Sequence, residues 1–207
     1  MPENLHKLFV ISSPSGGGKT SLINKLFEDS RSTNFEKSIS DTSRKKRQGD
    51  LEGKDYYFLS EKDFKDKIKK EEYVEYATVF GNFYGTSKEE IKTKYNNSNL
   101  ILELDWQGAY AVKELFDDAK LIFLVPPSLD DLKQRLIKRN LDSSEAIENR
   151  LSEAKKEISK SEMYDYLVLN DDFDKAFEDL SQILFEGISP IDFNSRASKD
   201  LIKRLVE

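Results

Sequence analysis

Four short apolar segments stand out from a strongly charged chain. They cover residues 8–11, 100–104, 121–125 and 166–169. None of them alternates regularly between apolar and polar residues, and continuous apolar runs of this length are typical of strands covered on both faces. The pattern therefore predicts four buried β-strands.

Helical patterns separate these segments. Apolar residues recur at helical spacing over residues 20–29, where Leu22, Ile23, Leu26 and Phe27 form one stripe, and again over 129–137 and 173–184. Strands that alternate with helices indicate an α/β fold, in which helices cover both faces of a parallel sheet.

Two segments depart from this alternation. Residues 38–86 read as short strands and turns with one charged helix near 61–70, which predicts a small mixed α/β lobe inserted into the core. Residues 130–160 read as a charged helical lid with a narrow apolar stripe. The lid is expected to break at "NLDSS", where Ser143 or Ser144 would cap a second helix. The remainder, 1–37, 87–129 and 161–207, is expected to form the core.

Composition narrows the classes of function. The chain has 207 residues, no cysteine and a net charge of −6, and no apolar run approaches the length of a membrane-spanning helix. The N-terminus lacks the apolar stretch of a signal peptide. These features predict a cytoplasmic protein that binds neither membranes nor nucleic acids. The oligomeric state stays open, because the apolar face of the C-terminal segment could dock on the core or contact another subunit.

The segment "SSPSGGGKTS", residues 12–21, lies between a predicted strand and a predicted helix. Glycines let backbone N–H groups converge on an anion, and the start of a helix adds its dipole. The spacing matches a P-loop, in which Lys19 would bind the β- and γ-phosphates of ATP and Thr20 would bind Mg²⁺. Ser13 stands where the pattern usually has glycine, so an ordinary glycine-rich loop is the alternative.

A second group of residues could bind a monoester phosphate. Arg44 and Arg47 flank two lysines in a chain that is acidic overall. A solvated basic turn or a localisation signal is the alternative. Asp105 follows the apolar segment "LILEL", and a carboxylate at the end of a buried strand could orient water molecules bound to Mg²⁺.

These motifs and several others occur in an order that resembles guanylate kinase. The matching stretches are "SPSGGGKTSL", S-x-T-x-R-x-x-R-x-G-x-x-x-G-x-x-Y over 40–56, "EYATVFGNFYGTS", "LELDWQGA", "PPS", "RLIKRNLDSSEAIENRL" and "VLNDDFDKA". The resemblance implies a P-loop kinase that transfers the γ-phosphoryl group of ATP to GMP, and also to dGMP, with Mg²⁺ as cofactor.

The resemblance also implies roles for individual residues. The GMP-binding residues would be Ser40, Arg44, Arg47, Tyr56, Glu75, Tyr84, Thr86 and Glu103. The ATP-binding residues would be Ser13, Pro14, Ser15, Gly16, Gly17, Gly18, Lys19, Thr20, Ser21, Arg135, Arg139 and Asn170. The catalytic residues would be Lys19, Arg44, Arg139 and Arg150.

The chemistry of guanine favours a carboxylate reader. Guanine presents its N1–H and 2-amino donors side by side, so Glu75, Glu103 or both could accept them, and the Thr86 hydroxyl could donate to O6. The family often has aspartate at position 103 and glycine at position 140, where this chain has glutamate and Asn140. Glu75 could instead be a surface carboxylate, and the lid arginines could instead form surface ion pairs.

Two other functions compete with GMP phosphorylation. The first is a catalytically silent guanylate-kinase-like module that binds proteins, and Lys19, Thr20 and the lid arginines argue against it. The second is a kinase for another nucleotide or a phosphorylated sugar, and Glu75 and Thr86 argue against it.

Overall fold

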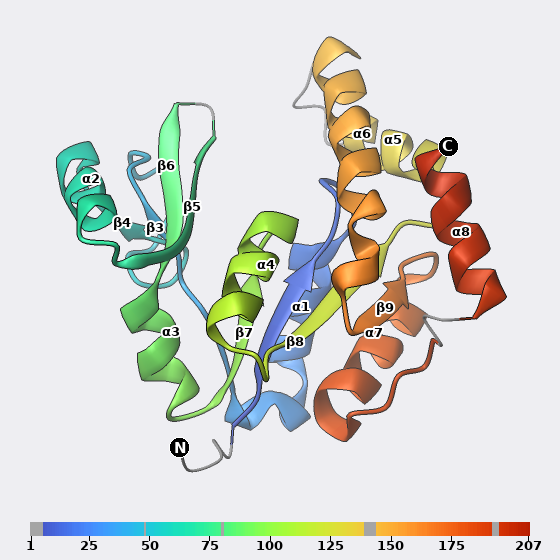
Figure 1. Ribbon diagram of the computed structural model, residues 1–207, viewed down its shortest axis with the longest axis horizontal. Helices are drawn as coiled ribbons and strands as arrows, with labels where there is room; N and C mark the ends of the chain where they lie inside the picture. Colours follow the sequence, from blue (N-terminus) through green and yellow to red (C-terminus); the bar gives the residue numbers. More distant parts are fainter. Residues whose placement is uncertain (1–5, 48, 80, 139–143, 192–194) are drawn as a thin grey trace.

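The computed structural model describes residues 6–47, 49–79, 81–138, 144–191 and 195–207. Its main sheet has five parallel strands in the order β2-β7-β1-β8-β9 (Figure 1). The strands are β1 (Leu8–Ser12), β2 (Phe35–Lys37), β7 (Asn99–Glu103), β8 (Lys120–Val125) and β9 (Tyr166–Leu169). The four predicted strands and the α/β class are confirmed, and β2 is an additional strand.

The buried strands alternate their side chains between two apolar layers. Leu8 and Val10 face one layer, which α3, α4 and α6 cover, and Phe9 and Ile11 face the other, which α1 and α7 cover. Both layers are buried, so each strand reads as a continuous apolar run. The covering helices are α1 (Lys19–Glu28), α3 (Lys88–Tyr95), α4 (Trp106–Leu115), α6 (Ser144–Ser159) and α7 (Phe173–Ser181).

A second sheet of four strands projects from the core, in the order β4-β3-β6-β5. Its strands are β3 (Asp41–Thr42), β4 (Tyr57–Phe58), β5 (Tyr73–Val79) and β6 (Asn82–Ser87), and α2 (Glu61–Lys69) packs on it. Phe64 of α2 is fully buried and stacks on Tyr73 and Phe83 of this sheet. The apolar contact explains why a helix as charged as α2 stays on the sheet.

Three helices lie on the side of the core opposite the second sheet (Figure 1). They are α5 (Leu129–Lys138), α6 and the C-terminal α8 (Arg196–Val206). Two short 3₁₀ helices, η1 (Ser30–Asn34) and η2 (Ser161–Met163), and a short π-helix, η3 (Gln182–Glu186), complete the described elements. Leu205 of α8 is buried in the same apolar layer as Ile158 of α6. Of the two possibilities left open for the C-terminal segment, the structure shows docking on the core.

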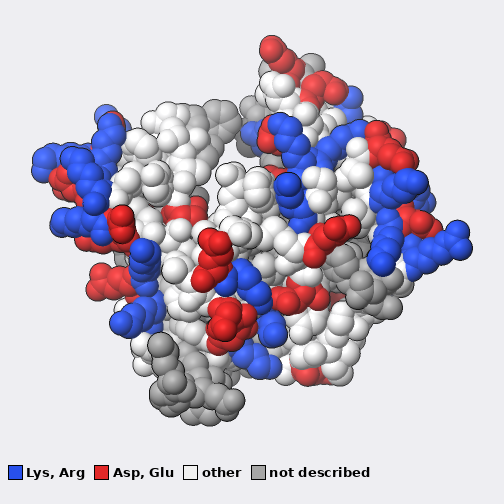
Figure 2. All heavy atoms as spheres, in the orientation of Figure 1, with Lys and Arg blue, Asp and Glu red and all other residues white. Residues whose placement is uncertain are grey.

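The carboxyl ends of the parallel strands meet between the second sheet and α6. In Figure 2 the surface is hollowed there, and charged side chains gather instead over α2, α6 and α8. Strand β1 lies between β7 and β8, with β2 and β7 on one side of it and β8 and β9 on the other. The order of the strands therefore reverses at β1, and such a point is where open α/β sheets bind ligands. None of the helices in the described ranges has the length and apolar character needed to cross a membrane.

Candidate active site

The glycine-rich loop between β1 and α1 depends on its glycines. A Cβ at Gly17 would lie 2.9 Å from the Pro14 carbonyl and from the Ser13 side chain. Gly18 caps α1 with φ +93°, and a Cβ there would lie 2.3 Å from the Asn170 amide. Larger residues at either position would therefore displace the loop. This packing favours a shaped phosphate-binding loop over an ordinary flexible one.

Lys19 begins α1 and points back across the strand ends. Its ammonium donates to the Leu104 carbonyl at 3.1 Å. Burial lowers the pKa of Lys19, and the carboxylates of Glu103, Glu157 and Asp105 oppose that shift. Negative charge around the ammonium favours its protonated form, which is the form that can bind phosphate.

Glu103 lies beside the P-loop. Its carboxylate accepts a hydrogen bond of 2.6 Å from the Thr20 hydroxyl and forms an ion pair of 2.7 Å with Lys37. Burial alone would raise the pKa of Glu103, but Lys37, Thr20 and Lys19 outweigh it and lower the pKa. Glu103, which was expected to face guanine, lies in this structure against Thr20, the residue expected to bind Mg²⁺.

Asn170 and two of the lid arginines hold the P-loop from outside. The Asn170 amide donates 2.7 Å to the Gly17 carbonyl, and Arg135 donates 2.8 Å to the Asn170 carbonyl. Arg150 donates 3.1 Å to the Ser15 hydroxyl. The structure therefore brings Asn170, Arg135 and Arg150 together at the P-loop, and their expected contacts with adenine and ATP stay predictions. Arg139, with Asn140, lies outside the described residues.

The second sheet gathers a basic and aromatic group. Arg44 pairs with Asp50 at 2.9 Å, and its guanidinium lies 5.4 Å from the centre of the Tyr56 ring. The ring of Tyr84 meets that of Tyr56 edge to face at 5.7 Å. The structure thus brings Arg44, Tyr56 and Tyr84 together as expected. The Arg47 side chain is exposed. Its backbone N–H donates to the Asp50 carboxylate at 2.8 Å, and its carbonyl accepts the Asp50 N–H at 3.1 Å.

Glu75 is held at the base of this sheet. The Thr86 hydroxyl donates to its carboxylate at 2.7 Å and lies 3.5 Å from the Ser40 hydroxyl. Burial raises the pKa of Glu75, and Thr86 opposes that shift. Glu75 is partly buried and hydrogen-bonded to Thr86, so it is not an ordinary surface carboxylate. This geometry favours a role in binding the base of a nucleotide.

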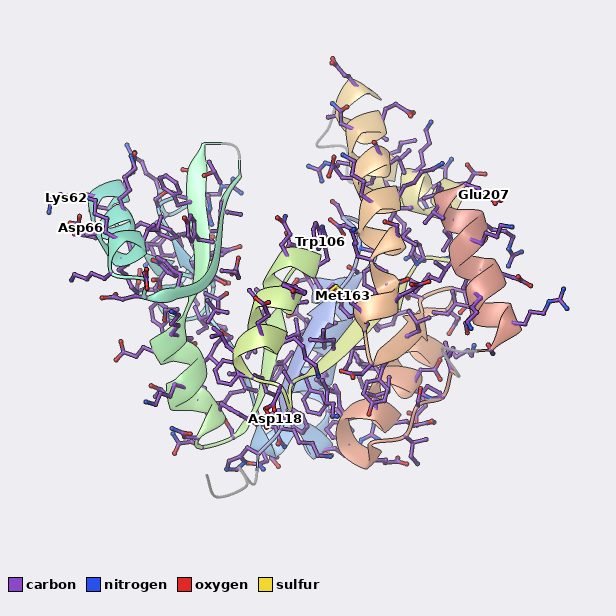
Figure 3. The ribbon with its side chains drawn as sticks, viewed as in Figure 1. Lys62, Asp66, Trp106, Asp118, Met163 and Glu207 are labelled. Atoms are coloured by element: carbon purple, nitrogen blue, oxygen red, sulfur yellow. The ribbon has the colours of Figure 1, made fainter. Side chains whose placement is uncertain are left out.

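A cavity of about 240 Å³ connects Glu75 with the core. Its lining includes Glu75 from β5, Asp105 just before α4, and Gly108 of α4. The Asp105 carboxylate accepts the Gly108 N–H at 2.9 Å, which caps α4 beside Trp106 (Figure 3). Asp105, expected to orient Mg²⁺-bound water, therefore also shares the cavity with the proposed base reader. Among the described residues, no group of His, Cys, Asp or Glu side chains could bind a metal ion by itself.

Two residues of the site were not predicted. Lys37, at the end of a three-residue strand that carries two charges, has the sequence pattern of a surface lysine. Glu157 of α6 is half-buried, and burial raises its pKa to about 7 although Lys19 opposes the shift. The signal for Glu157 was its place three residues after Ala154, which puts it beside the narrow apolar stripe of α6.

Comparison with known proteins agrees with this geometry. The guanylate kinase family model matches residues 5–187. The guanylate kinase of Wolbachia sp. subsp. Brugia malayi (strain TRS) is 47% identical over 184 residues, which cover 88% of this chain and 93% of that protein. The guanylate kinase of Francisella tularensis subsp. holarctica (strain LVS) is 43% identical over 184 residues, or 87% of this chain and 97% of that protein.

A solved structure is similar over nearly the whole chain. The crystal structure of guanylate kinase from Anaplasma phagocytophilum superposes with a TM-score of 0.69 at 32% sequence identity. The match covers 99% of this chain and 98% of that chain.

Proposed function

The chain belongs to the guanylate kinase family, and we propose that it transfers the γ-phosphoryl group of ATP to GMP, and to dGMP, with the residues described above. It is an ATP:GMP phosphotransferase that yields ADP and GDP. The alternative of a silent protein-binding module has no support from these relatives. The reaction is assigned to the cytoplasm, which the absence of cysteine suits.

The P-loop supports ATP binding. Gly17 and Gly18 leave no room for a larger side chain. Lys19 is the first residue of α1, so its charge and the positive end of the helix dipole both lie at this loop. Lys19 and Arg150 would neutralise charge on the transferring group, together with Arg139. The core comprises residues 1–37, 87–129 and 161–207, and residues 130–160 close over ATP as a lid.

The second sheet supports GMP binding, so residues 38–86 are assigned to the GMP lobe. Arg44, Tyr56 and Tyr84 offer a guanidinium and two hydroxyls for the phosphate, and Ser40 and Arg47 complete this group. Glu75 would accept from N1–H and the 2-amino group of guanine, and the Thr86 hydroxyl would donate to O6. The attacking GMP phosphate is already anionic, so the reaction needs positioning and charge neutralisation rather than a strong base.

The oxygen donors beside the P-loop suit Mg²⁺. The Thr20 hydroxyl donates a hydrogen bond to Glu103, so the lone pairs of the Thr20 oxygen stay available for a metal ion. Mg²⁺ prefers hard oxygen ligands of this kind. When bound with ATP, Mg²⁺ would neutralise phosphate charge. We assign Thr20 to the metal and Glu103 to holding Thr20. Asp105 would orient metal-bound water or take part in reading the base, as its place in the Glu75 cavity allows.

The observation that carries this proposal is the Lys19 ammonium, because phosphoryl transfer at a P-loop needs a positive charge at this position. We expect Lys19→Ala to lower kcat by about 10²-fold or more while the protein stays folded. The measurement is a coupled assay of ADP release with GMP, dGMP, AMP, CMP and UMP. Lys25→Ala is the matched control, because Lys25 is an exposed lysine of the same helix that pairs with Glu28 at 3.8 Å. Normal GMP phosphorylation by folded Lys19→Ala would refute the proposal.

A further inference from the structure

Lys37 is a charged residue of the site to which the reaction described above gives no role. It ends β2, an edge strand of the main sheet, and pairs in register with Ile101 of β7. Its ammonium lies 2.7 Å from Oε2 of Glu103. The Lys37 side chain is 36% exposed and that of Glu103 is 19% exposed, so solvent screens this ion pair less than a surface pair.

The other oxygen of Glu103 has a different partner. Oε1 accepts the Thr20 hydroxyl at 2.6 Å. Each carboxylate oxygen is therefore held by one side chain, from β2 on one side and from α1 on the other. A carboxylate fixed at both oxygens cannot rotate without breaking one of the two contacts. Its orientation in turn decides where the Thr20 hydroxyl points its proton.

We propose that Lys37 is a positioning residue that fixes the Glu103 carboxylate as the acceptor of the Thr20 hydroxyl, and so orients the Thr20 oxygen toward the Mg²⁺ that accompanies ATP. The inference rests on the proposed function, because it concerns the metal that the nucleotide brings. Lys37 touches neither nucleotide nor metal in this role.

A second consequence concerns Lys19. The Glu103 carboxylate attracts Lys19 more strongly than any other described charge does. The ion pair with Lys37 neutralises much of the negative charge of Glu103 and so weakens its attraction for Lys19. Lys19 can then stay at the Leu104 carbonyl, from which it can turn to a phosphate. Without Lys37, Glu103 would draw Lys19 toward itself and away from the Leu104 carbonyl.

The test is metal-dependent nucleotide binding, measured with a fluorescent ADP analogue. Lys37→Met keeps the length of the side chain and removes its charge. In EDTA the variant should bind the analogue within about twofold of wild type. The Mg²⁺ concentration that gives half of the metal-dependent gain in affinity should rise about tenfold, the scale on which partners of metal ligands act. Lys37→Arg should restore most of the loss.

The control is Lys65→Met, which removes an equally short ion pair, 2.5 Å to Glu61, from the exposed face of α2. It should leave Mg²⁺ dependence unchanged. Thermal unfolding of every variant shows whether the fold is kept. In the assay of GMP phosphorylation, Lys37→Met should keep the KM for GMP, and excess Mg²⁺ should restore kcat to within about threefold.

A double-mutant cycle tests whether Lys37 acts through Glu103. In a Glu103→Gln background, Lys37→Met should change the half-saturating Mg²⁺ concentration by less than about twofold. An unchanged Mg²⁺ dependence of Lys37→Met would overturn the inference. So would an equal loss of ADP affinity in EDTA, which would mean that Lys37 contacts phosphate itself. A wild-type protein that releases no ADP with GMP would instead refute the proposed function, and the binding assay would still report on Lys37.

Discussion

At the scale of the residue, the proposed choice of guanine depends on Glu75. If its carboxylate accepts the two guanine donors, Glu75→Gln turns one acceptor into a donor and leaves a buried mismatch. We expect the KM for GMP to rise about 10- to 100-fold, the scale of a hydrogen bond to a charged group. The preference for GMP over AMP should shrink as well, because AMP carries an acceptor at N1.

Steady-state kinetics with GMP, IMP and AMP measures this effect. The KM for ATP should change little, since Glu75 lies on the second sheet. Glu89→Gln changes an exposed carboxylate at the start of α3 and serves as the control. If Glu75→Gln kept the wild-type KM for GMP and full discrimination against AMP, other groups would read the base.

Glu157 gives the molecule a pH-dependent stability. Its pKa of about 7 in the folded protein lies above the ordinary 4.5, mainly because of burial. Between those two pH values the folded chain holds a proton that the unfolded chain has released, so the free energy of unfolding falls as pH rises toward 7. Glu157→Gln removes this loss. The Tm of Glu157→Gln minus the Tm of wild type should therefore be larger at pH 8 than at pH 5, by about 2 °C or more.

Differential scanning calorimetry at the two pH values measures that difference. Glu148→Gln is the matched control on α6, because its exposed carboxylate pairs with Lys133 at 2.7 Å. A Tm difference between Glu157→Gln and wild type that is the same at both pH values would contradict the expected linkage.

At the scale of the element, continuous apolar runs predicted the strands better than any other feature. β1, β8 and β9 were found from such runs, because both faces of those strands are buried. β2 was missed because its three residues are half-buried or exposed and two of them are charged. The order of the strands also could not be predicted, since it depends on contacts between segments far apart in the chain.

Some parts of the candidate site could also be predicted from the sequence, and others could not. The P-loop was predicted because its backbone geometry requires glycine at fixed positions. The places of Glu103 and Asp105 were harder, because Glu103 ends β7 and Asp105 caps α4 only two residues later. Their spacing alone does not show which carboxylate faces the P-loop. Only the side-chain contacts show Glu103 at Thr20 and Asp105 in the Glu75 cavity.

Helix α8 lies beyond the segment matched by the family model, and it supports α6. Leu205 is 3% exposed in the layer that contains Ile158, and Lys155 of α6 donates 2.9 Å to the Glu207 carbonyl. Leu205→Asp would bury an unpaired charge and should release α8, which destabilises the protein by about 2 kcal/mol or more. Because α6 carries Arg150, kcat/KM for ATP should fall several-fold.

Limited proteolysis and thermal unfolding measure the release of α8. Lys199→Asp places the same charge on the exposed side of the helix and should leave both measurements near wild type. Equal resistance to proteolysis for Leu205→Asp and Lys199→Asp would show that α8 does not depend on this contact.

At the scale of the whole molecule, the two substrates are expected to bind on opposite sides of one cleft. The groups expected at the phosphate of GMP lie on the second sheet, and those expected at ATP lie on the P-loop and α6 (Figure 1). Arg44 is paired with Asp50 in the second sheet, so its charge is partly neutralised before any substrate binds. In-line transfer requires the phosphate of GMP to approach the γ-phosphate of ATP, and closure of the lobe and the lid would supply that approach.

We therefore expect closure to need both substrates. A non-hydrolysable ATP analogue with GMP should reduce the radius of gyration measured by X-ray scattering, and each nucleotide alone should reduce it less. Hydrogen exchange in residues 135–155 should slow in the same order, because the lid has little apolar surface to hold it closed without phosphate to bind. Arg150→Ala removes the contact with Ser15 at the P-loop, so exchange should slow less in that variant. A radius and an exchange rate that stay constant with both nucleotides bound would mean that the cleft is already closed enough for transfer.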